Sequence, residues 1–386
     1  MVYSLASSTW DEKEKNAMLE VMETGMYTMG SKVRMYEENF AQYFGSRYAI
    51  MVNSGSSANL VAVASLFYRK NNPLKPSDEV IVPAVSWSTT YHPLQQYKLH
   101  LKFVDIDIDT LNYDLEALRN AVTDKTRMIM AVNLLGNPNN FEIINEIIGE
   151  RDIILLEDNC ESMDAEFNGK KAGTFGLMGT FSSFFSHHIS TMEGGMVVTD
   201  DEELYHIMLS IRSHGWTRHL PETNHVTGQK LVDPFEESFR FVLPGYNLRP
   251  GELHGAVGIE QLKKLPTFVE QRRKNARIFQ ELFKNHPYLL IQKEIGKSSW
   301  FGFSLVLNDN APYTRKELVK LLTKYEIECR PIVSGNFLKN PVLKYYDYSK
   351  YGEIKNAEII DQQGLFVGNH HYDLEKSIED FQKILK

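Results

Sequence analysis

The sequence lacks the features that mark several common classes of protein. Only two cysteines occur among its 386 residues, Cys160 and Cys329, and they do not have CxxC spacing. We therefore expect neither a disulfide framework nor a zinc site, and predict no bound metal. No apolar stretch approaches the roughly 20 residues that span a bilayer, and the N-terminus lacks the pattern of a signal peptide. The sequence therefore predicts no contact with a membrane and a cytoplasmic location.

Positive charge is also scarce. Acidic residues number 50 and lysine plus arginine 42, which gives a formal net charge of -8. A nucleic-acid-binding protein needs a concentrated basic surface, and no run of lysine or arginine supplies one here. We therefore predict no nucleic-acid partner. The hydrophobic content of 42% and charged content of 24% are those of an ordinary globular protein.

The sequence does contain short apolar runs that alternate with polar, helix-compatible stretches. These runs are Tyr48–Val52, Glu79–Pro83, Leu101–Ile106, Arg127–Val132 and Asp152–Asp158. Such runs predict buried parallel strands joined by helical crossovers, and sheets of this kind bind ligands at the carboxyl ends of their strands. Helical periodicity follows Pro250, and strand–helix alternation then resumes. We therefore predict an α/β fold with a large domain over residues 1–250. Linking helices and a smaller α+β domain would cover residues 251–386.

The segment NSGSSANL (Asn53–Leu60) follows a predicted strand and opens a predicted helix. Glycine and small hydroxyl residues at such a turn leave backbone N–H groups free to bind an anion. A plain helix N-cap is the alternative, because serine is a favoured capping residue. The segment is not a Walker loop, since the Gly-Lys-Ser/Thr ending is missing.

The segment ILLEDNCES (Ile154–Ser162) ends a predicted buried strand in two acids. Asp158 could hold the protonated ring nitrogen of a pyridine cofactor, which would make the ring an electron sink. A helix N-cap is again the alternative.

The segment from Thr180 to Asp201 contains tandem histidines, His187 and His188, followed by Gly194-Gly195 and a strand. Neighbouring residues on an extended segment face opposite ways, so at most one of these histidines would be catalytic, while one would be a core residue and the other exposed. No third ligand at a familiar spacing supports a metal site.

Together with GYNLR (Gly245–Arg249), these motifs occur in the order found in the sugar aminotransferase and dehydratase family (DegT/DnrJ/EryC/StrS). The chain resembles that family, which has the aspartate-aminotransferase fold of pyridoxal-phosphate enzymes, over nearly its whole length. The resemblance implies a large domain with a mostly parallel sheet, a smaller C-terminal domain, and a homodimer with shared active sites.

One departure from the family pattern concerns the lysine that binds the cofactor covalently, because His187 stands at that position. No lysine occurs anywhere between residues 172 and 229, so a shift of alignment does not restore one. Imidazole cannot form the covalent link, but with an unperturbed pKa near ~6.5 it is suited to proton transfer. The family's glutamine is also replaced by Glu161, and its glycine by Asp164.

These departures, together with PAVSWSTTYHPLQQY (Pro83–Tyr97) and HGWTR (His214–Arg218), resemble the dehydratase branch of the family. That branch removes the C3 hydroxyl of a GDP-linked 4-keto-6-deoxy sugar on the way to surface polysaccharides. The resemblance implies pyridoxal 5'-phosphate or pyridoxamine 5'-phosphate bound without a covalent link, L-glutamate as amino donor, and release of ammonia. A hexose and a heptose substrate both remain open. The alternatives are a nucleotide-sugar aminotransferase of the same fold and a non-catalytic family member.

The resemblance also implies roles for individual residues. The implied catalytic residues are His187 as acid–base, Asp158 at the ring nitrogen, Glu161 near the ring hydroxyl or a water, and His214 near the leaving group. The implied cofactor contacts are Gly55, Ser56, Ser182 and Asn247 at the phosphate, the last from the neighbouring subunit, and Trp87 and Glu161 at the ring. The implied substrate contacts are Ser186, Arg218 and Arg249. A core position for Trp87 and a surface position for His214 and Arg218 remain alternatives.

Overall fold

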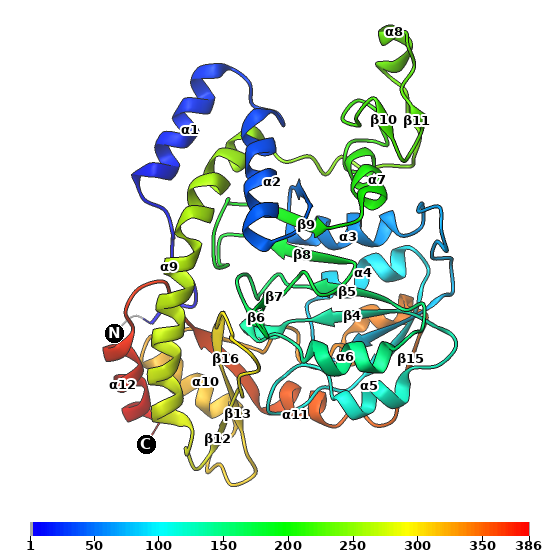
Figure 1. Ribbon diagram of the computed structural model, residues 1–386. Coiled ribbons are helices and arrows are strands. Elements are labelled where there is room, and N and C mark those ends of the chain that lie inside the picture. Colours follow the sequence, from blue (N-terminus) through cyan, green and yellow to red (C-terminus); the bar gives the residue numbers. More distant parts are fainter. Residues whose placement is uncertain (1–2, 386) are drawn as a thin grey trace.

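The computed structural model describes residues 3–385, and an eight-stranded sheet forms its centre (Figure 1). In spatial order the strands are β1 (Tyr48–Val52), β9 (Gly195–Thr199), β8 (Met178–Ser182), β5 (Ile154–Asp158), β4 (Thr126–Val132), β2 (Glu79–Pro83), β3 (His100–Val104) and β15 (Tyr348–Lys350). All ladders from β8 to β15 are parallel, whereas β9 is antiparallel to both β8 and β1. The predicted mostly parallel sheet is thus confirmed. The expected parallel pairing of Tyr48–Val52 is wrong, because within residues 3–385 this strand pairs with β9 alone, and that ladder is antiparallel.

Helices cover both faces of this sheet. Residues alternate between the two faces along each strand, so Ile50 and Val52 pack against one set of helices while Ala49 and Met51 pack against another. The first face is covered by α3 (Gly55–Ser65), α4 (Ser88–Gln96) and α7 (Glu202–Arg212). The second face is covered by α2 (Ser31–Phe44), α5 (Leu115–Ala121), α6 (Phe141–Ile148) and part of α9 (Glu252–Phe283).

A second, antiparallel sheet lies beside the C-terminal half of α9 (Figure 1). Its strands are β12 (Leu289–Ile291), β13 (Gly302–Leu307), β16 (Gly364–Gly368) and β14 (Cys329–Arg330). It packs against α9, α10 (Arg315–Lys324) and α12 (Glu375–Ile384), while α11 (Asn356–Gln363) lies between it and the large sheet. Each side of residue 250 contributes a residue or strand to the other part. The strand β15 joins the large sheet, and Tyr3 packs into the core of the smaller part. The boundary at residues 250–251 stays a prediction.

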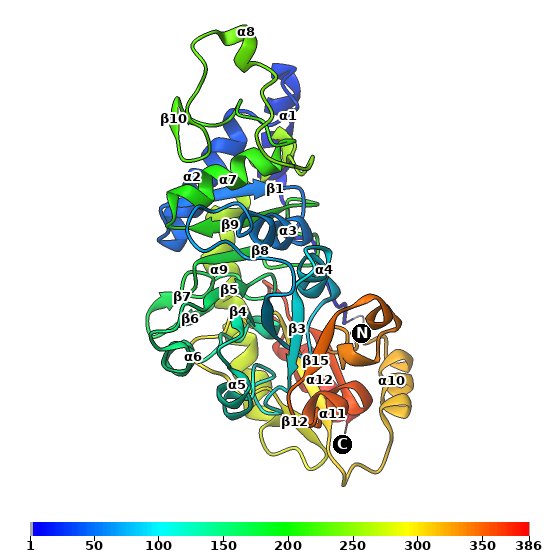
Figure 2. The same ribbon diagram turned by 90° about the vertical axis from the view of Figure 1, so that its right-hand side faces the viewer.

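The N-terminal helix α1 (Glu12–Thr24) packs along α9. Asp11 and Glu14 form a capping box at its start, and Gly25 ends it with a φ of 68° that favours glycine. An arm over residues 221–242 projects from the body of the molecule (Figures 1 and 2). It contains β10 (Thr223–Asn224), β11 (Gly228–Gln229) and α8 (Pro234–Glu237).

Short elements complete the description. They are β6 (Glu166–Phe167), β7 (Lys170–Lys171) and the 3-10 helices η1 (Leu134–Gly136), η2 (Phe337–Lys339) and η3 (Pro341–Tyr345). Within residues 3–385, none of the helices is both long and apolar enough to cross a bilayer.

Candidate active site

The turn from β1 into α3 forms one wall of the candidate site. Ser54 caps α3, because its Oγ accepts the Ser57 N–H at 3.1 Å. A Cβ added to Gly55 would lie 2.6 Å from Ser182 Cβ, so only glycine allows α3 to begin this close to the end of β8. The structure thereby brings Gly55, Ser56 and Ser182 together at the carboxyl ends of two strands. The free N–H groups and dipole of the helix N-terminus suit a phosphate group there.

Asp158 ends β5 and is only 5% exposed. Its Oδ2 accepts hydrogen bonds from Asn59 Nδ2 at 2.9 Å and Thr90 Oγ1 at 2.7 Å, and its Oδ1 accepts the Cys160 N–H at 3.2 Å. Since a carboxylate has about four lone-pair positions, Oδ1 keeps the capacity for one more donor. The next element is β6 rather than a helix, so the N-cap alternative for Asp158 is wrong. A pyridinium N–H fits this arrangement.

The neighbouring acid, Glu157, has a structural role. It is fully buried and accepts backbone N–H groups of Gly173, Phe175 and Gly176 at 2.6–2.7 Å. Burial raises the pKa of its carboxyl, and these three donors oppose that shift. The strand therefore points one acid into the interior and presents the other, Asp158, at the edge of the sheet.

Trp87 lies three residues before Thr90 and is exposed. It precedes α4, whose residue Thr90 donates to Asp158, and 58% of its surface is accessible. The alternative of a core tryptophan is therefore wrong, and its ring is free to cover a planar group.

His187 lies in the loop between β8 and β9 and is half-buried. Its ring is edge-on to Phe184 at 6.0 Å and to Phe301 at 5.2 Å, and its buried Nδ1 has no hydrogen-bond partner among the described residues. Burial, reinforced by the nearby Arg272 guanidinium, lowers the pKa of His187 to about 4. The folded protein therefore holds this pKa below the unperturbed imidazole value of ~6.5. The imidazole is neutral at physiological pH, which is the form that can accept a proton.

His188 is a core histidine. It is fully buried, its Nε2 is 3.1 Å from the Ser299 carbonyl oxygen, and burial keeps its pKa well below the usual range. The expectation that one histidine of the pair would be exposed is wrong. The segment is not extended, because the His187 N–H donates to the Phe184 carbonyl, and both imidazoles contact the ring of Phe301.

Glu161 borders the same region from the loop after β5. Its Oε2 accepts the Leu135 N–H at 3.1 Å, and the Leu135 carbonyl accepts the Phe301 N–H at 3.0 Å. Burial, with a smaller contribution from Asp158, raises the pKa of Glu161 to about 7. A carboxyl group with this pKa can either hold or release a proton near neutrality. Ser186, just before His187, is half-buried.

The remaining predicted residues form a second group around residues 213–218 and 247–249. Asn247 is exposed, and its Oδ1 accepts the Arg249 Nε–H at 3.0 Å. His214 is partly buried rather than free on the surface, with its ring 5.5 Å from that of Trp216. Arg218 is exposed, with its guanidinium 5.8 Å from the same indole ring.

Arg218 and Arg249 line a cavity of about 670 Å³, together with Lys32, Trp216 and His219. Neither Asp158 nor His187 lines this cavity. The groups are linked through the backbone, because the Asn53 N–H donates to the Leu248 carbonyl at 3.0 Å.

Several residues of the site were not predicted from the sequence. Asn59 and Thr90 hold Asp158, and Thr180 Oγ1 donates to Asn59 Oδ1 at 2.6 Å, which fixes the amide. All three lie within the motifs 53–60, 83–97 and 180–201, so polar residues in these motifs were the available signal. No sequence signal marks Phe301 or Arg272, which reach His187 from distant elements. Among residues 3–385, no cluster of three or more His, Cys, Asp or Glu side chains could hold a metal ion.

The chain is similar to proteins of one family over almost its whole length. A sequence model of the DegT/DnrJ/EryC1/StrS aminotransferase family matches residues 8–384. The GDP-4-keto-6-deoxy-D-mannose 3-dehydratase of Yersinia pseudotuberculosis is 65% identical over 385 residues, which cover 100% of this chain and 98% of that protein.

Two solved structures extend the comparison. A GDP-4-keto-6-deoxymannose-3-dehydratase with a trapped PLP–glutamate geminal diamine is 63% identical, with a TM-score of 0.99 and 100% coverage of both chains. A histidine-to-asparagine variant of GDP-4-keto-6-deoxymannose-3-dehydratase with bound GDP-perosamine gives the same identity, TM-score and coverage. The likeness therefore extends to the complete fold.

Proposed function

The chain belongs to the DegT/DnrJ/EryC1/StrS aminotransferase family, and from that premise we propose that it is a GDP-4-keto-6-deoxy-D-mannose 3-dehydratase. The reaction converts GDP-4-keto-6-deoxy-D-mannose and L-glutamate into GDP-4-keto-3,6-dideoxy-D-mannose, 2-oxoglutarate and ammonia. Glutamate supplies the two electrons that reduce C3, and its nitrogen leaves as ammonia. The observation that carries this proposal is His187, an acid–base group that stands at the lysine position of a site otherwise built for pyridoxal phosphate.

Pyridoxamine phosphate supplies an amino group for the C4 ketone and a pyridinium ring that accepts electrons. The chain's own residues would hold it without a covalent link. Gly55, Ser56 and Ser182 would bind the phosphate, and Asp158 would keep the ring nitrogen protonated by charge and hydrogen bonding. Trp87 would cover one face of the ring.

His187 would move the proton. As a neutral imidazole it can accept the proton from C4', the carbon that bears the amine. Its low pKa then makes the protonated form a strong acid, suited to delivering a proton to the departing C3 hydroxyl. Glu161, with a pKa of about 7, would hold a proton beside the ring or a water. Because His187 cannot bind the product covalently, as a lysine would, ammonia is released instead of an amino sugar.

The second group of residues would complete the site from a neighbouring copy. We place Asn247 at the cofactor phosphate of the partner subunit, and Arg218 and Arg249 at the substrate diphosphate, where paired guanidinium donors match phosphate geometry. Ser186 and His214 would contact the sugar. The cavity that Arg218 and Arg249 line does not include Asp158 or His187, which supports this shared arrangement. Exposed apolar residues of the projecting arm support an interface, namely Leu231, Val232, Phe235, Phe239 and Phe241. We place the enzyme in the cytoplasm, where nucleotide sugars and glutamate are available.

The test is a product assay on the purified protein. With pyridoxal phosphate, glutamate and the GDP-linked keto-sugar, we expect one ammonia and one 2-oxoglutarate for each 3-deoxy sugar. An amino sugar without ammonia would identify an aminotransferase, and no product would identify a non-catalytic protein. A parallel assay with the GDP-linked keto-heptose decides whether the substrate sugar has six or seven carbons.

Subunit sharing has its own test. Asn247→Ala and His187→Asn variants should each be inactive, and mixed dimers should regain up to one functional site in two. Mixed dimers that stay inactive would contradict the shared site.

A further inference from the structure

The orientation of His187 depends on the loop that carries it. Its Nδ1 has no hydrogen-bond partner among the described residues, and its ring is bordered by the aromatic rings of Phe184 and Phe301. Ring contacts of this kind allow small rotations that a hydrogen bond would prevent. The backbone of the loop between β8 and β9 must therefore set where the imidazole lies.

Ser190 lies three residues after His187, and both its backbone N–H and its backbone carbonyl form hydrogen bonds to residues outside the loop. The Ser190 N–H donates to Gln261 Oε1 on α9 at 2.9 Å. The Ser190 carbonyl accepts the indole N–H of Trp10 at 2.8 Å. Ser190 is buried, so losing either partner would leave a backbone polar group unsatisfied.

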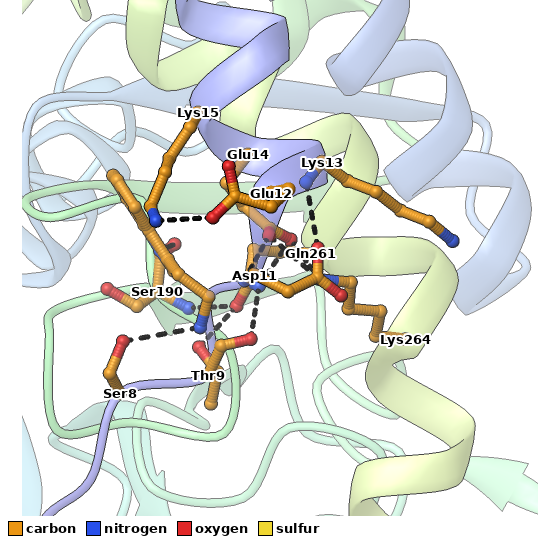
Figure 3. Close-up of polar contacts among 11 residues, drawn as sticks. Ser8, Thr9, Asp11, Glu12, Lys13, Glu14, Lys15, Ser190, Gln261 and Lys264 are labelled. Atoms are coloured by element: carbon orange, nitrogen blue, oxygen red, sulfur yellow. Dashed lines mark hydrogen bonds and ion pairs between the residues drawn. The ribbon is translucent and has the colours of Figure 1, made fainter.

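All four hydrogen-bonding positions of the Gln261 amide are occupied by neighbouring residues (Figure 3). Its Oε1 also accepts the Thr9 hydroxyl at 2.6 Å, and its Nε2 donates to the Thr9 carbonyl at 3.1 Å and to Glu14 Oε1 at 2.8 Å. The Ser190 N–H can only donate and the Glu14 carboxylate only accepts, so chemistry dictates the orientation of the amide. Gln261 is fully buried and cannot exchange these partners for water.

Glu14 anchors the network to the start of α1. It is fully buried, yet Lys264 on α9 pairs with it at 2.6 Å and the Asp11 N–H donates to it at 2.8 Å. A buried carboxylate with such partners is costly to disturb. Figure 3 shows the resulting continuity, in which the N-terminal strap (residues 8–14), α9 and Ser190 meet around Gln261.

We propose that Gln261 and Trp10 are positioning residues that hold the His187 loop at the distance proton transfer requires. This inference rests on the proposed function, in which His187 is the group that transfers the proton at C4'. A misplacement of about 1 Å costs on the order of 10²-fold in rate, so a loop released at Ser190 would slow the chemical step more than it weakens binding. Gln261→Met removes the acceptor and both amide donors at similar length, and Trp10→Phe removes the indole N–H while keeping an aromatic ring.

The experiment uses holoenzyme loaded with pyridoxal phosphate. Single-turnover conversion by glutamate should be slower by about 10-fold or more in each variant, while the Kd of the cofactor stays within about twofold. The isotope effect with glutamate deuterated at C2 should rise, because proton transfer becomes more fully rate-limiting. Hydrogen exchange of residues 184–191 in the cofactor-free protein should accelerate, which is a readout independent of activity.

Phe283→Leu is the matched control, because it removes packing at the far end of α9 without touching Ser190 or Gln261. If Gln261→Met and Trp10→Phe are no slower than this variant at an equal loss of Tm, or if loop exchange does not change, the positioning role is wrong. If wild-type protein itself shows no conversion by glutamate, the proposed function fails. Hydrogen exchange of residues 184–191 then still decides whether Gln261 and Trp10 hold the loop.

Discussion

Asp158 and His187 are assigned to one cofactor, yet the molecule holds them in opposite ways. Asp158 ends a buried strand and accepts three hydrogen bonds, from α3, from α4 and from its own turn. His187 lies on a loop between two aromatic rings, and burial together with Arg272 keeps its ring neutral.

The two side chains have different surroundings because their proposed roles differ: Asp158 would stay ionised, whereas His187 would gain and lose a proton. A buried carboxylate stays ionised only where donors replace water, so a residue that keeps a fixed negative charge needs a complete polar shell. A group that gains and then loses a proton benefits from a setting that makes its charged form unstable. Under the proposed roles, the charge-keeping region is the polar shell of Asp158, and the proton-passing region is the aromatic surroundings of His187.

The largest expected effect comes from removing the imidazole of His187, the proposed proton-transfer group. His187→Asn should lower turnover by roughly 10²- to 10⁴-fold, the usual contribution of an acid–base group, because an amide does not accept a proton at neutral pH. Cofactor affinity should change little, since the phosphate turn and Asp158 remain. Steady-state assays and fluorescence titration with pyridoxal phosphate measure the two quantities.

His188→Asn is the control for that experiment. It removes a buried imidazole that contacts the Ser299 carbonyl, so we expect lower Tm with turnover well above that of His187→Asn. Near-normal turnover in His187→Asn, or a greater loss in His188→Asn, would reverse the assignment of the base.

A smaller effect tests the polar shell of Asp158. Thr90→Val removes one hydrogen bond to a buried carboxylate at nearly constant volume, which should cost about 1.5–3 kcal/mol. Because Asp158 then holds the pyridinium less well, the Kd of the cofactor should rise by roughly 10- to 100-fold. Calorimetric titration measures the change, and Thr90→Ser, which keeps the hydroxyl, should stay close to wild type. Equal affinities for the valine and serine variants would show that the hydroxyl does not support Asp158.

The sequence predicted the charge-keeping region better than the proton-passing region. Asp158 ends one predicted strand and Gly55 follows another, and strand ends meet at one edge of a parallel sheet, so the proximity of these two residues could be inferred from local patterns. Ser182 was predicted only through the family resemblance. Asn59 and Thr90 could have been added, since they lie in the same motifs.

The environment of His187 could not be read in this way. Phe301 and Arg272 lie more than eighty residues away, and Gln261 and Trp10 reach the loop from α9 and the N-terminal strap. The depressed pKa of His187 arises from burial and from the distant Arg272 guanidinium, which the local sequence does not reveal. The antiparallel β9 was likewise hidden, because an apolar run does not reveal the direction of its neighbour.

The smallest expected effect concerns Glu161, which lies between the two regions. Its pKa is about 7 in the folded protein and close to its ordinary value of 4.5 when unfolded. The folded state therefore binds this proton more tightly, so the stabilisation is full below about pH 4.5 and is lost as the pH rises to 7. Glu161→Gln restores the residue of the family pattern and cannot ionise, so it loses nothing over that range.

We expect Glu161→Gln to match wild type near pH 5 and to be more stable at pH 8, by on the order of 2 kcal/mol. Urea unfolding of the cofactor-free protein at both pH values measures this difference, and the titration of other groups cancels between the two proteins. Glu23→Gln, an exposed acid on α1, should show no such trend. A Glu161→Gln difference that is independent of pH would mean that Glu161 is solvated and belongs to neither region. A difference confined to high pH would show that the molecule keeps an acid with a pKa near neutrality close to Asp158, at a cost in stability.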